Sequence, residues 1–236
     1  PKTYARINDL KFTSTQDQSE PGRARRSARA ESPDAAPPNS PNAGTTSPPR
    51  PSTLNPVRSA GDILTLWRNE NIDYDFVRRD WFEENLVFEL KSHPPLGKLS
   101  SFQHGLFYIQ DPSTLLAVRE LNPQPGETIL DLCAAPGGKL TYIAQRMRNE
   151  GKLIAHDTFP DRLKLIEENC TRLGVTIAQT VLPSTHDPRP SSFDRVLVDA
   201  PCSNTGVMRR RVDLRWRIRP EEIDRLRATQ LELLRQ

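Results

Sequence analysis

Cysteine is scarce in this sequence, which has three in 236 residues: Cys133, Cys170 and Cys202. A sparse and odd count excludes a disulfide framework and is typical of a reducing compartment, so we expect a cytoplasmic protein. Long apolar runs are missing as well. No stretch approaches the roughly 18 apolar residues that a membrane span needs, and the N-terminal residues lack the apolar core of a secretory signal. We therefore expect no membrane partner.

Metal-ligand patterns are missing too. The four histidines have no ligand-like spacing to one another or to the cysteines. A zinc site draws its ligands from such residues at defined spacings, so we expect no metal.

Arginines gather at two places, although the net charge is only +3. The first cluster, residues 22–29 (GRARRSAR), lies within residues 14–60, which are rich in Pro, Ser, Ala, Asn and Arg. That stretch has almost no apolar side chains whose burial could offset its ordering entropy. We expect a disordered insertion whose arginines are solvated, with auxiliary RNA contact as the alternative. The second cluster, residues 208–219 (MRRRVDLRWRIR), is considered below.

The residues on either side of the insertion, 1–13 and 61–122, predict a small α+β module of an RNA-binding type. Alternation in residues 3–12 and 85–90 indicates strands, and Ile63, Leu64 and Trp67 indicate an amphipathic helix. Residues 105–121 predict a strand followed by a helix.

From residue 123 to residue 236 the pattern alternates between strands and helices. Expected strands are residues 128–133, 152–157, 175–182 and 193–202, and expected helices are residues 138–149, 160–174 and 220–236. This alternation predicts an α/β fold with a doubly wound, mostly parallel sheet. Ligands of such sheets bind at the carboxyl ends of the strands, where the loops with Cys133, Asp157 and Cys202 fall.

A glycine turn, DLCAAPGGK (residues 131–139), follows the first of these strands. A phosphate-binding loop needs Gly-Lys-Ser/Thr and a dinucleotide site needs G-x-G-x-x-G; both patterns fail here. What remains is a tight turn and a carboxylate, Asp157, ending the next strand, where it can bind ribose hydroxyls. This favours a nucleoside cofactor without phosphates, of which S-adenosylmethionine is the common one, although a plain strand–helix connector remains possible.

The motifs LDLCAAPGGK and DAPCSNTGVMRR, with RIN near the start and QDPST before the turn, resemble the Sun/Fmu family of RNA (cytosine-5) methyltransferases, above all its bacterial small-subunit ribosomal RNA enzymes. The resemblance implies a Rossmann-like, S-adenosylmethionine-dependent methyltransferase domain. It places the cofactor against the loop formed by Cys133, Ala134, Ala135, Pro136, Gly137, Gly138 and Lys139.

Three carboxylates acquire roles from this resemblance. Asp157 holds the ribose, and Asp199 of DAPC lies between the cofactor and the target base. The family has a further acid after the third strand, where this chain reads LPST; nearby Asp187 is our candidate for it.

The chemistry that the resemblance implies needs a thiolate, which adds to carbon 6 of cytosine and makes carbon 5 nucleophilic. An acid beside the ring nitrogen, Asp199, neutralises the developing charge. In this family the nucleophile is a cysteine of a Thr-Cys motif on a later strand, whereas the cysteine of the Pro-Cys motif, here Cys202, assists product release. No Thr-Cys motif occurs before Gln236. We therefore expect a fragment with an incomplete sheet that does not methylate RNA by itself.

RNA contacts are expected after the Pro-Cys motif. Arg209, Arg210, Arg211 and Arg215 are interpreted as a phosphate clamp, with a solvated face as the alternative. By resemblance alone, Arg6 and Asn8 are further candidates for contacts to RNA, with contacts to a loop as the alternative.

The leading hypothesis is thus a monomeric methyltransferase acting on RNA, expected to be ribosomal RNA. Two other hypotheses stay open. One is a non-catalytic RNA-binding protein that keeps the methyltransferase fold. The other is a DNA cytosine-5 methyltransferase that uses Cys202 as its nucleophile, which the CAAPGGK turn disfavours.

Overall fold

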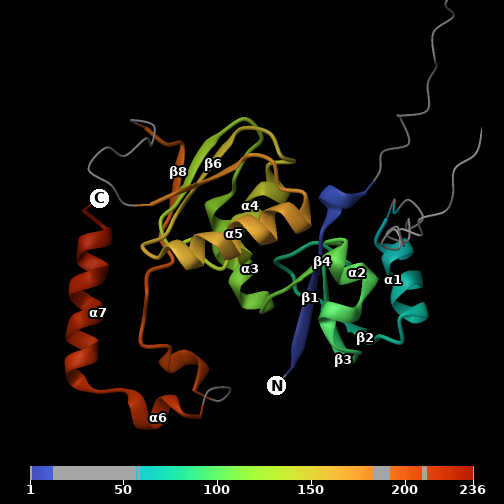
Figure 1. The fold of residues 1–236 in the computed structure, drawn as a ribbon, viewed down its shortest axis with the longest axis horizontal. Coiled ribbons are helices and arrows are strands. Elements are labelled where there is room, and N and C mark those ends of the chain that lie inside the picture. Colours follow the sequence, from blue (N-terminus) through green and yellow to red (C-terminus); the bar gives the residue numbers. More distant parts are fainter. Residues whose placement is uncertain (1, 13–56, 58, 183–191, 209–211, 236) are drawn as a thin grey trace, which may run out of the picture.

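The computed structural model describes residues 2–12, 57, 59–182, 192–208 and 212–235. These residues form two four-stranded sheets that lie side by side, followed by a helical arm (Figure 1). The first sheet belongs to the N-terminal part of the chain and the second to the part that carries the glycine turn.

The first sheet is antiparallel, with the strand order β2-β3-β1-β4. Its strands are β1 (Thr3–Ile7), β2 (Asp73–Phe76), β3 (Val87–Ser92) and β4 (Phe107–Ile109). Helix α1 (Ala60–Asn69) packs on it by burying Ile63 and Trp67, which are four residues apart and so share one face of the helix. Trp67 contacts the rings of Phe88 and Phe107 edge to face.

The second sheet is parallel, with the strand order β7-β6-β5-β8. Its strands are β5 (Thr128–Asp131), β6 (Lys152–His156), β7 (Ala178–Val181) and β8 (Arg195–Leu197). Helices α3 (Leu115–Leu121), α4 (Gly138–Arg146) and α5 (Pro160–Leu173) precede β5, β6 and β7 in turn. The predicted α/β fold with a parallel sheet is therefore confirmed, with shorter strands than expected.

Helix ends follow local sequence signals. Ser59 and Asp62 form a capping box at the start of α1. Helix α5 begins with Pro160 at its first turn and ends at Gly174, whose φ of 74° suits glycine. Because Val57 is already buried against the first sheet, the folded part resumes a few residues before the predicted boundary at residue 61. The other residues assigned to the insertion, up to 56, and Arg58 lie outside the described residues.

One hydrophobic core continues from the first sheet into the second, through Leu86, Val87 and Tyr108 on one side and Ile129 and Leu140 on the other. The two parts predicted as a small module and a catalytic domain therefore share an interior.

Arg6 and Asn8 lie in this seam, and the expectation that they contact RNA is corrected by their burial: 1% and 2% of their surfaces are exposed. The Arg6 guanidinium donates to Thr141 Oγ1 at 3.0 Å, and its Cζ lies 4.9 Å from the centre of the Tyr142 ring. Asn8 Nδ2 donates to the backbone oxygens of Gly105 and Leu173, both at 2.8 Å. Both side chains are occupied in joining the two sheets.

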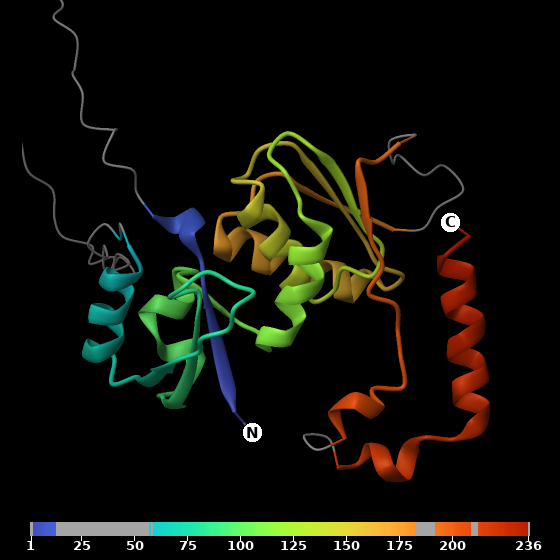
Figure 2. The same cartoon turned by 180° about the vertical axis from the view of Figure 1, so that it is seen from behind.

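The chain leaves the second sheet after β8 in an extended segment and forms two helices, α6 (Leu214–Arg217) and α7 (Pro220–Leu233). Both views show this arm standing beside the body (Figures 1 and 2). Helix α7 contacts the site through Leu226, which is buried, and through Gln230 Nε2, which donates to Pro201 O at 2.8 Å. Sequence patterns predicted α7, but α6, β2 and the short helix α2 (Ser100–Gln103) were not predicted. In the described part of the chain, none of the helices has the length and apolar character to span a membrane.

Candidate cofactor and catalytic site

The glycine turn after β5 is held by backbone hydrogen bonds. Ala134 N donates to His156 O at 3.0 Å and Gly137 N donates to Ala134 O at 2.7 Å. Gly137 has a φ of 101°, a conformation that favours glycine. Ala134, Ala135 and Gly137 are buried. The loop predicted to hold the cofactor is therefore fixed by the fold itself.

The first sheet packs closely against the next glycine. A Cβ at Gly138 would lie 3.1 Å from Cε1 of Tyr108 and 3.4 Å from Nε2 of Gln110. A side chain at this position would push both residues away. Glycine here allows the segment after β4 to contact the start of α4.

Asp157 follows β6 and is 2% exposed. Its carboxylate accepts from the backbone nitrogens of Ala135 and Phe159, each at 3.3 Å, and lies 3.3 Å from Nη1 of Arg162. All three contacts are long for a charged acceptor, which leaves the carboxylate capacity for closer partners.

Asp131, the last residue of β5, is a buried carboxyl that the sequence analysis did not single out. Its Oδ1 accepts from Cys133 N at 3.4 Å, and its Oδ2 has no hydrogen-bond partner among the described residues. Burial raises the pKa of Asp131 to about 7, so ionised and neutral forms coexist near neutral pH.

Asp199 follows β8, and its carboxylate pairs with Lys139 Nζ of the glycine turn. The Asp199 side chain remains 55% exposed, while that of Lys139 is 18% exposed. The ion pair joins the loop after β8 to the loop after β5.

Three carboxylates thus converge from the ends of three adjacent strands. Their combined effect is felt at Cys133: burial, then Asp131, Asp157 and Asp199, raise the pKa of this thiol to about 11. Cys133 is therefore a neutral thiol at physiological pH. The same surroundings favour a cationic ligand, because carboxylates in a partly buried site are stabilised by positive charge.

Two cavities open on this cluster. The first, which we call the cofactor cavity, has a volume of about 550 Å³ and lies between the strand ends and α7. Its lining includes Leu132, Cys133, Ala135, Asp157, Thr158, Phe159, Arg162, Asp199, Pro201, Cys202, Leu226 and Leu233. The second, which we call the glycine-turn cavity, has a volume of about 200 Å³. Its lining includes Tyr108, Gln110, Asp131, Cys133, Ala135, Pro136, Gly138, Lys139 and Asp199. Cys133, Ala135 and Asp199 line both cavities, so Asp199 lies where the two adjoin.

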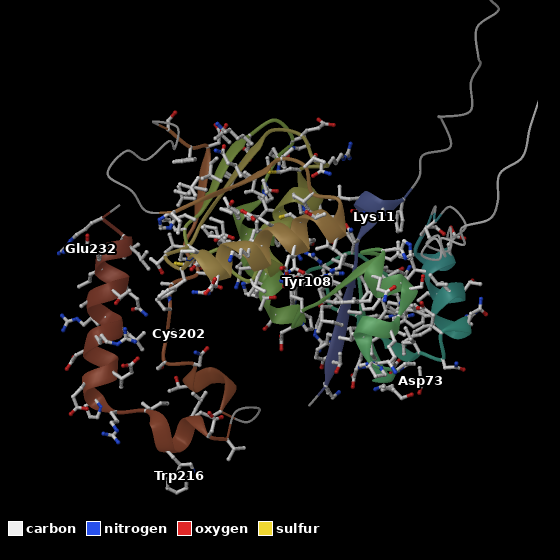
Figure 3. All side chains as sticks on the ribbon, in the orientation of Figure 1. Lys11, Asp73, Tyr108, Cys202, Trp216 and Glu232 are labelled. Carbon is white, nitrogen blue, oxygen red and sulfur yellow. The ribbon has the colours of Figure 1, made fainter. Side chains whose placement is uncertain are left out.

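The thiols differ in their surroundings. Burial raises the pKa of Cys170 to about 11, and that residue lies on α5 away from both cavities. Cys202 is exposed on the extended segment after β8, where it lines the cofactor cavity (Figure 3). Its Sγ lies 3.8 Å from Asn204 Oδ1. Of the three cysteines, Cys202 is the accessible one.

The remaining predicted residues fall outside what the structure describes. Asp187 and Arg209–Arg211 lie outside the described residues, and Arg215 is placed only as part of the backbone of α6. Trp216, in the same arginine-rich segment, is 85% exposed and points away from the body (Figure 3).

Four residues that line the two cavities received no role in the sequence analysis. Gln110 opens the motif QDPST and Asp131 opens the glycine-turn motif, yet neither received a role. Phe159 and Arg162, which line the cofactor cavity, belong to a segment whose periodicity showed only a helix. No group of three or more His, Cys, Asp or Glu suited to a metal ion occurs within the described parts of the chain.

Comparison with known proteins identifies the family. Residues 118–236 match the family described as 16S rRNA methyltransferase RsmB/F. The probable ribosomal RNA small subunit methyltransferase B of Bacillus subtilis is 44% identical over 142 residues, covering 57% of this chain and 31% of that protein. The 28S rRNA (cytosine-C(5))-methyltransferase of Mus musculus is 39% identical over 178 residues, covering 73% of this chain and 22% of that protein. The chain therefore spans a third or less of the length of these two relatives.

Solved structures agree on the fold. The crystal structure of PH0851 has a TM-score of 0.71 at 24% identity and covers 99% of this chain and 42% of that one. A methyltransferase homologue from Pyrococcus horikoshii has a TM-score of 0.58 at 27% identity and covers 90% of this chain and 54% of that one. With the motifs, the strand-end carboxylates and the family match taken together, the chain belongs to the RsmB/F family of ribosomal RNA methyltransferases.

Proposed function

We propose that this chain is part of a cytoplasmic enzyme that transfers a methyl group from S-adenosylmethionine to carbon 5 of a cytosine in ribosomal RNA. The family match and the rRNA (cytosine-C5) relatives support RNA as the substrate. The observation that carries the proposal is the convergence of Asp131, Asp157 and Asp199 around two adjoining cavities.

The cofactor of this family, S-adenosylmethionine, supplies an electrophilic methyl group on a sulfonium centre. The residues of the cofactor cavity fit it in three respects. Asp157 offers a carboxylate to a ribose diol, as carboxylates at this strand end do in related sheets. Phe159, with 60% of its surface exposed, offers a ring face to an adenine. The strand-end carboxylates suit the positive charge of the sulfonium and the α-ammonium.

The glycine-turn cavity lies along the loop that the resemblance gives to the cofactor, so it extends the cofactor site. Lys139 and Asp199 present a cation and a carboxylate to it, and Asp131 lies on its wall. A base held at Asp199 and Cys202 would lie next to a methyl donor bound along the strand ends. Adjacent sites of this kind supply the proximity on which group transfer depends.

Cytosine carbon 5 becomes nucleophilic when a cysteine thiolate adds to carbon 6, and the negative charge then spreads onto the ring nitrogen and oxygen. We assign Asp199 to lie beside that nitrogen, and Lys139, its ion-pair partner, to offset the negative charge that develops on the ring. After transfer, carbon 5 loses its proton to a base, and the thiolate leaves as the ring double bond re-forms.

Cys202 is assigned the assisting role, in the release of the product. Its exposed position on the segment after β8 supports access to the base from the side of the arm. The Cys202→Ser variant of the complete gene product is incubated with small-subunit ribosomal RNA and S-adenosylmethionine. An RNA–protein adduct that survives denaturing electrophoresis, and accumulates over the wild type, is expected. If the adduct is lost instead, Cys202 is the nucleophile.

The methyl-transfer proposal itself is tested by mass spectrometry of the RNA after incubation with the complete gene product. Appearance of 5-methylcytosine that depends on Asp199 is expected. RNA in which 5-methylcytosine forms equally well with the Asp199→Ala variant would overturn the assignment of Asp199.

A further inference from the structure

Gln110 has no assigned role, although it lines the glycine-turn cavity. It lies directly after β4, in the first sheet, whereas the other walls of that cavity come largely from the second sheet. Its backbone nitrogen donates to Tyr4 O at 3.0 Å, which fixes the main chain. Its side-chain Oε1 is buried and has no hydrogen-bond partner among the described residues.

Acceptors outnumber donors around this cavity. Asp131 Oδ2 is a second buried oxygen without a hydrogen-bond partner in the described part of the chain. Among the lining residues, the one cation is Lys139, which already pairs with the Asp199 carboxylate. A buried acceptor left unpaired costs about 1–3 kcal/mol, a cost that an apolar side chain of similar shape would avoid. The cavity therefore suits a ligand group that is positively charged and brings N–H donors.

The position of the cavity indicates which part of a cofactor reaches it. It adjoins the cofactor cavity at Cys133 and Ala135 of the glycine turn. Asp157 and Phe159, to which the ribose and the adenine are assigned, line only the larger cavity. With the nucleoside held there, the amino-acid end of the cofactor extends along the glycine turn into the smaller cavity. That end carries an ammonium group, which has donors and no acceptor.

The contact between Gln110 and the glycine turn gives this end two different partners. The carboxamide Nε2 and Cδ lie 3.4 and 3.5 Å from the point that a Cβ of Gly138 would occupy, so glycine lets the carboxamide reach the turn. Helix α4 begins at Gly138, and its N-cap, Gly137, supplies no side-chain cap. The N–H groups of its first turn therefore suit the α-carboxylate, whereas Gln110 and Asp131 offer acceptors to the α-ammonium.

We propose that Gln110 is a cofactor-binding residue, whose carboxamide oxygen accepts a hydrogen bond from the α-ammonium group of S-adenosylmethionine. This inference rests on the proposed function and adds a cofactor contact from the first sheet. The terminal torsion of a glutamine is broad and roughly two-fold, so Oε1 turns toward an arriving donor without a change in the main chain. One cofactor molecule then contacts both sheets, with its nucleoside at the second and its ammonium at the first.

The test measures, by calorimetry on the complete gene product, the affinities of S-adenosylhomocysteine and of its analogue with hydrogen in place of the α-amino group. Gln110→Leu should weaken S-adenosylhomocysteine binding on the order of tenfold, the worth of one hydrogen bond to a charged group. The same variant should bind the analogue as the wild type does, because the analogue has no ammonium donor to lose. The melting temperature of the ligand-free protein should not fall.

Two further variants make the result specific. Gln110→Glu keeps an acceptor oxygen, so it should retain the wild-type preference for S-adenosylhomocysteine over the analogue. If Gln110→Leu does not fold, this variant decides, and loss of the preference in it counts against the inference. The matched control is Gln103→Leu, the same change at an exposed glutamine of α2 whose Nε2 donates to Gly97 O. It should behave as the wild type.

The outcomes that would overturn the inference are distinguishable. Unchanged S-adenosylhomocysteine affinity in Gln110→Leu removes Gln110 from the cofactor site. Equal weakening of both ligands in that variant makes Gln110 a support of the glycine turn only. A wild type that binds the two ligands equally well rejects the ammonium contact and leaves the cofactor assignment intact, whereas a wild type that fails to bind S-adenosylhomocysteine rejects the proposed function itself.

Discussion

The two sides of the cofactor cavity are built differently. On one side, Asp157 is 2% exposed and the neighbouring Asp131, at the end of β5, is 1% exposed, and the parallel sheet and its helices enclose both. On the other side lies the segment from β8 to α7, in which Cys202 is exposed on an extended stretch without regular secondary structure. Trp216 is 85% exposed, and Leu234, directly after α7, is 71% exposed. Figure 3 shows Cys202 and Trp216 along this arm, away from the enclosed loops.

This difference separates two tasks. The enclosed side has its geometry set by folding, so a cofactor that binds there meets a preorganised surface and loses little free energy in ordering it. The open side presents groups to a large partner, and its arginine-rich sequence suits a polyanion. Changes on the enclosed side should therefore alter stability and cofactor affinity, and changes on the open side should alter RNA binding.

The largest effect is expected on the free energy of unfolding, for a change in the seam between the two sheets, which supports the enclosed side. Arg6→Ala removes one of the largest fully buried side chains, leaving a void and removing the donor to Thr141 Oγ1. We expect the free energy of unfolding to fall by about 3–5 kcal/mol, as for other large-to-small core changes, measured by denaturant titration. Arg68→Ala, at an exposed position of α1, is the control and should change it by less than about 0.5 kcal/mol. Equal effects of the two changes would show that the seam contributes little.

The next effect concerns Asp131, whose pKa of about 7 exceeds its ordinary value of 3.8. Between these values the folded state holds a proton that the unfolded state has lost, so stability falls as pH rises through this window and is constant above it. Asp131→Asn cannot titrate. The unfolding free energy of the wild type relative to this variant should therefore fall by about 3 kcal/mol between pH 5 and pH 8. Parallel pH profiles of the two proteins would show that Asp131 titrates normally.

The sequence predicted the enclosed side well, because its signals are local. The glycine turn, Asp157 at the end of the next strand and the helix bounded by Pro160 and Gly174 are each written in a few adjacent residues. The parallel pairing of β5 with β6 and β8 then follows from alternation of strands and helices.

What the sequence could not show depends on contacts between distant residues. Arg6 was interpreted as an RNA or loop contact by resemblance alone, because its partner Thr141 lies 135 positions away in the sequence. Gln110 and Gly138 meet only after the two sheets pack together. The raised pKa of Asp131 likewise arises from burial, which the letters DLCAAPGGK do not reveal.

A smaller effect is expected on cofactor affinity. Asp157→Ala should weaken binding of S-adenosylmethionine on the order of tenfold, the worth of a charged hydrogen bond to a ribose hydroxyl, as measured by calorimetry. The control is Asp161→Ala at the start of α5, because the Asp161 side chain is 97% exposed and should have no role in the cavity. Equal affinity of the wild type and the Asp157→Ala variant would remove Asp157 from the cofactor site.

The smallest effect is expected on the open side, as a change in how steeply RNA affinity falls with salt concentration. Each arginine that contacts a phosphate of single-stranded RNA contributes about 0.7 log units of affinity per decade of salt. Replacing Arg209 and Arg210 by alanine should therefore flatten the salt dependence by about 1.4 log units per decade, measured by fluorescence anisotropy with a labelled oligonucleotide, without altering S-adenosylmethionine affinity.

The matched control for this last prediction removes the same charge at the opposite end of the parallel sheet. Arg148 and Lys152 are exposed and lie at the amino end of β6, away from the strand ends that form the cavities. Their double replacement by alanine should leave the slope unchanged, because phosphates bound at the arm are too distant for direct contact. If both double variants flatten the slope equally, RNA responds only to net charge, and the arginines after the Pro-Cys motif form a solvated surface instead of a phosphate clamp.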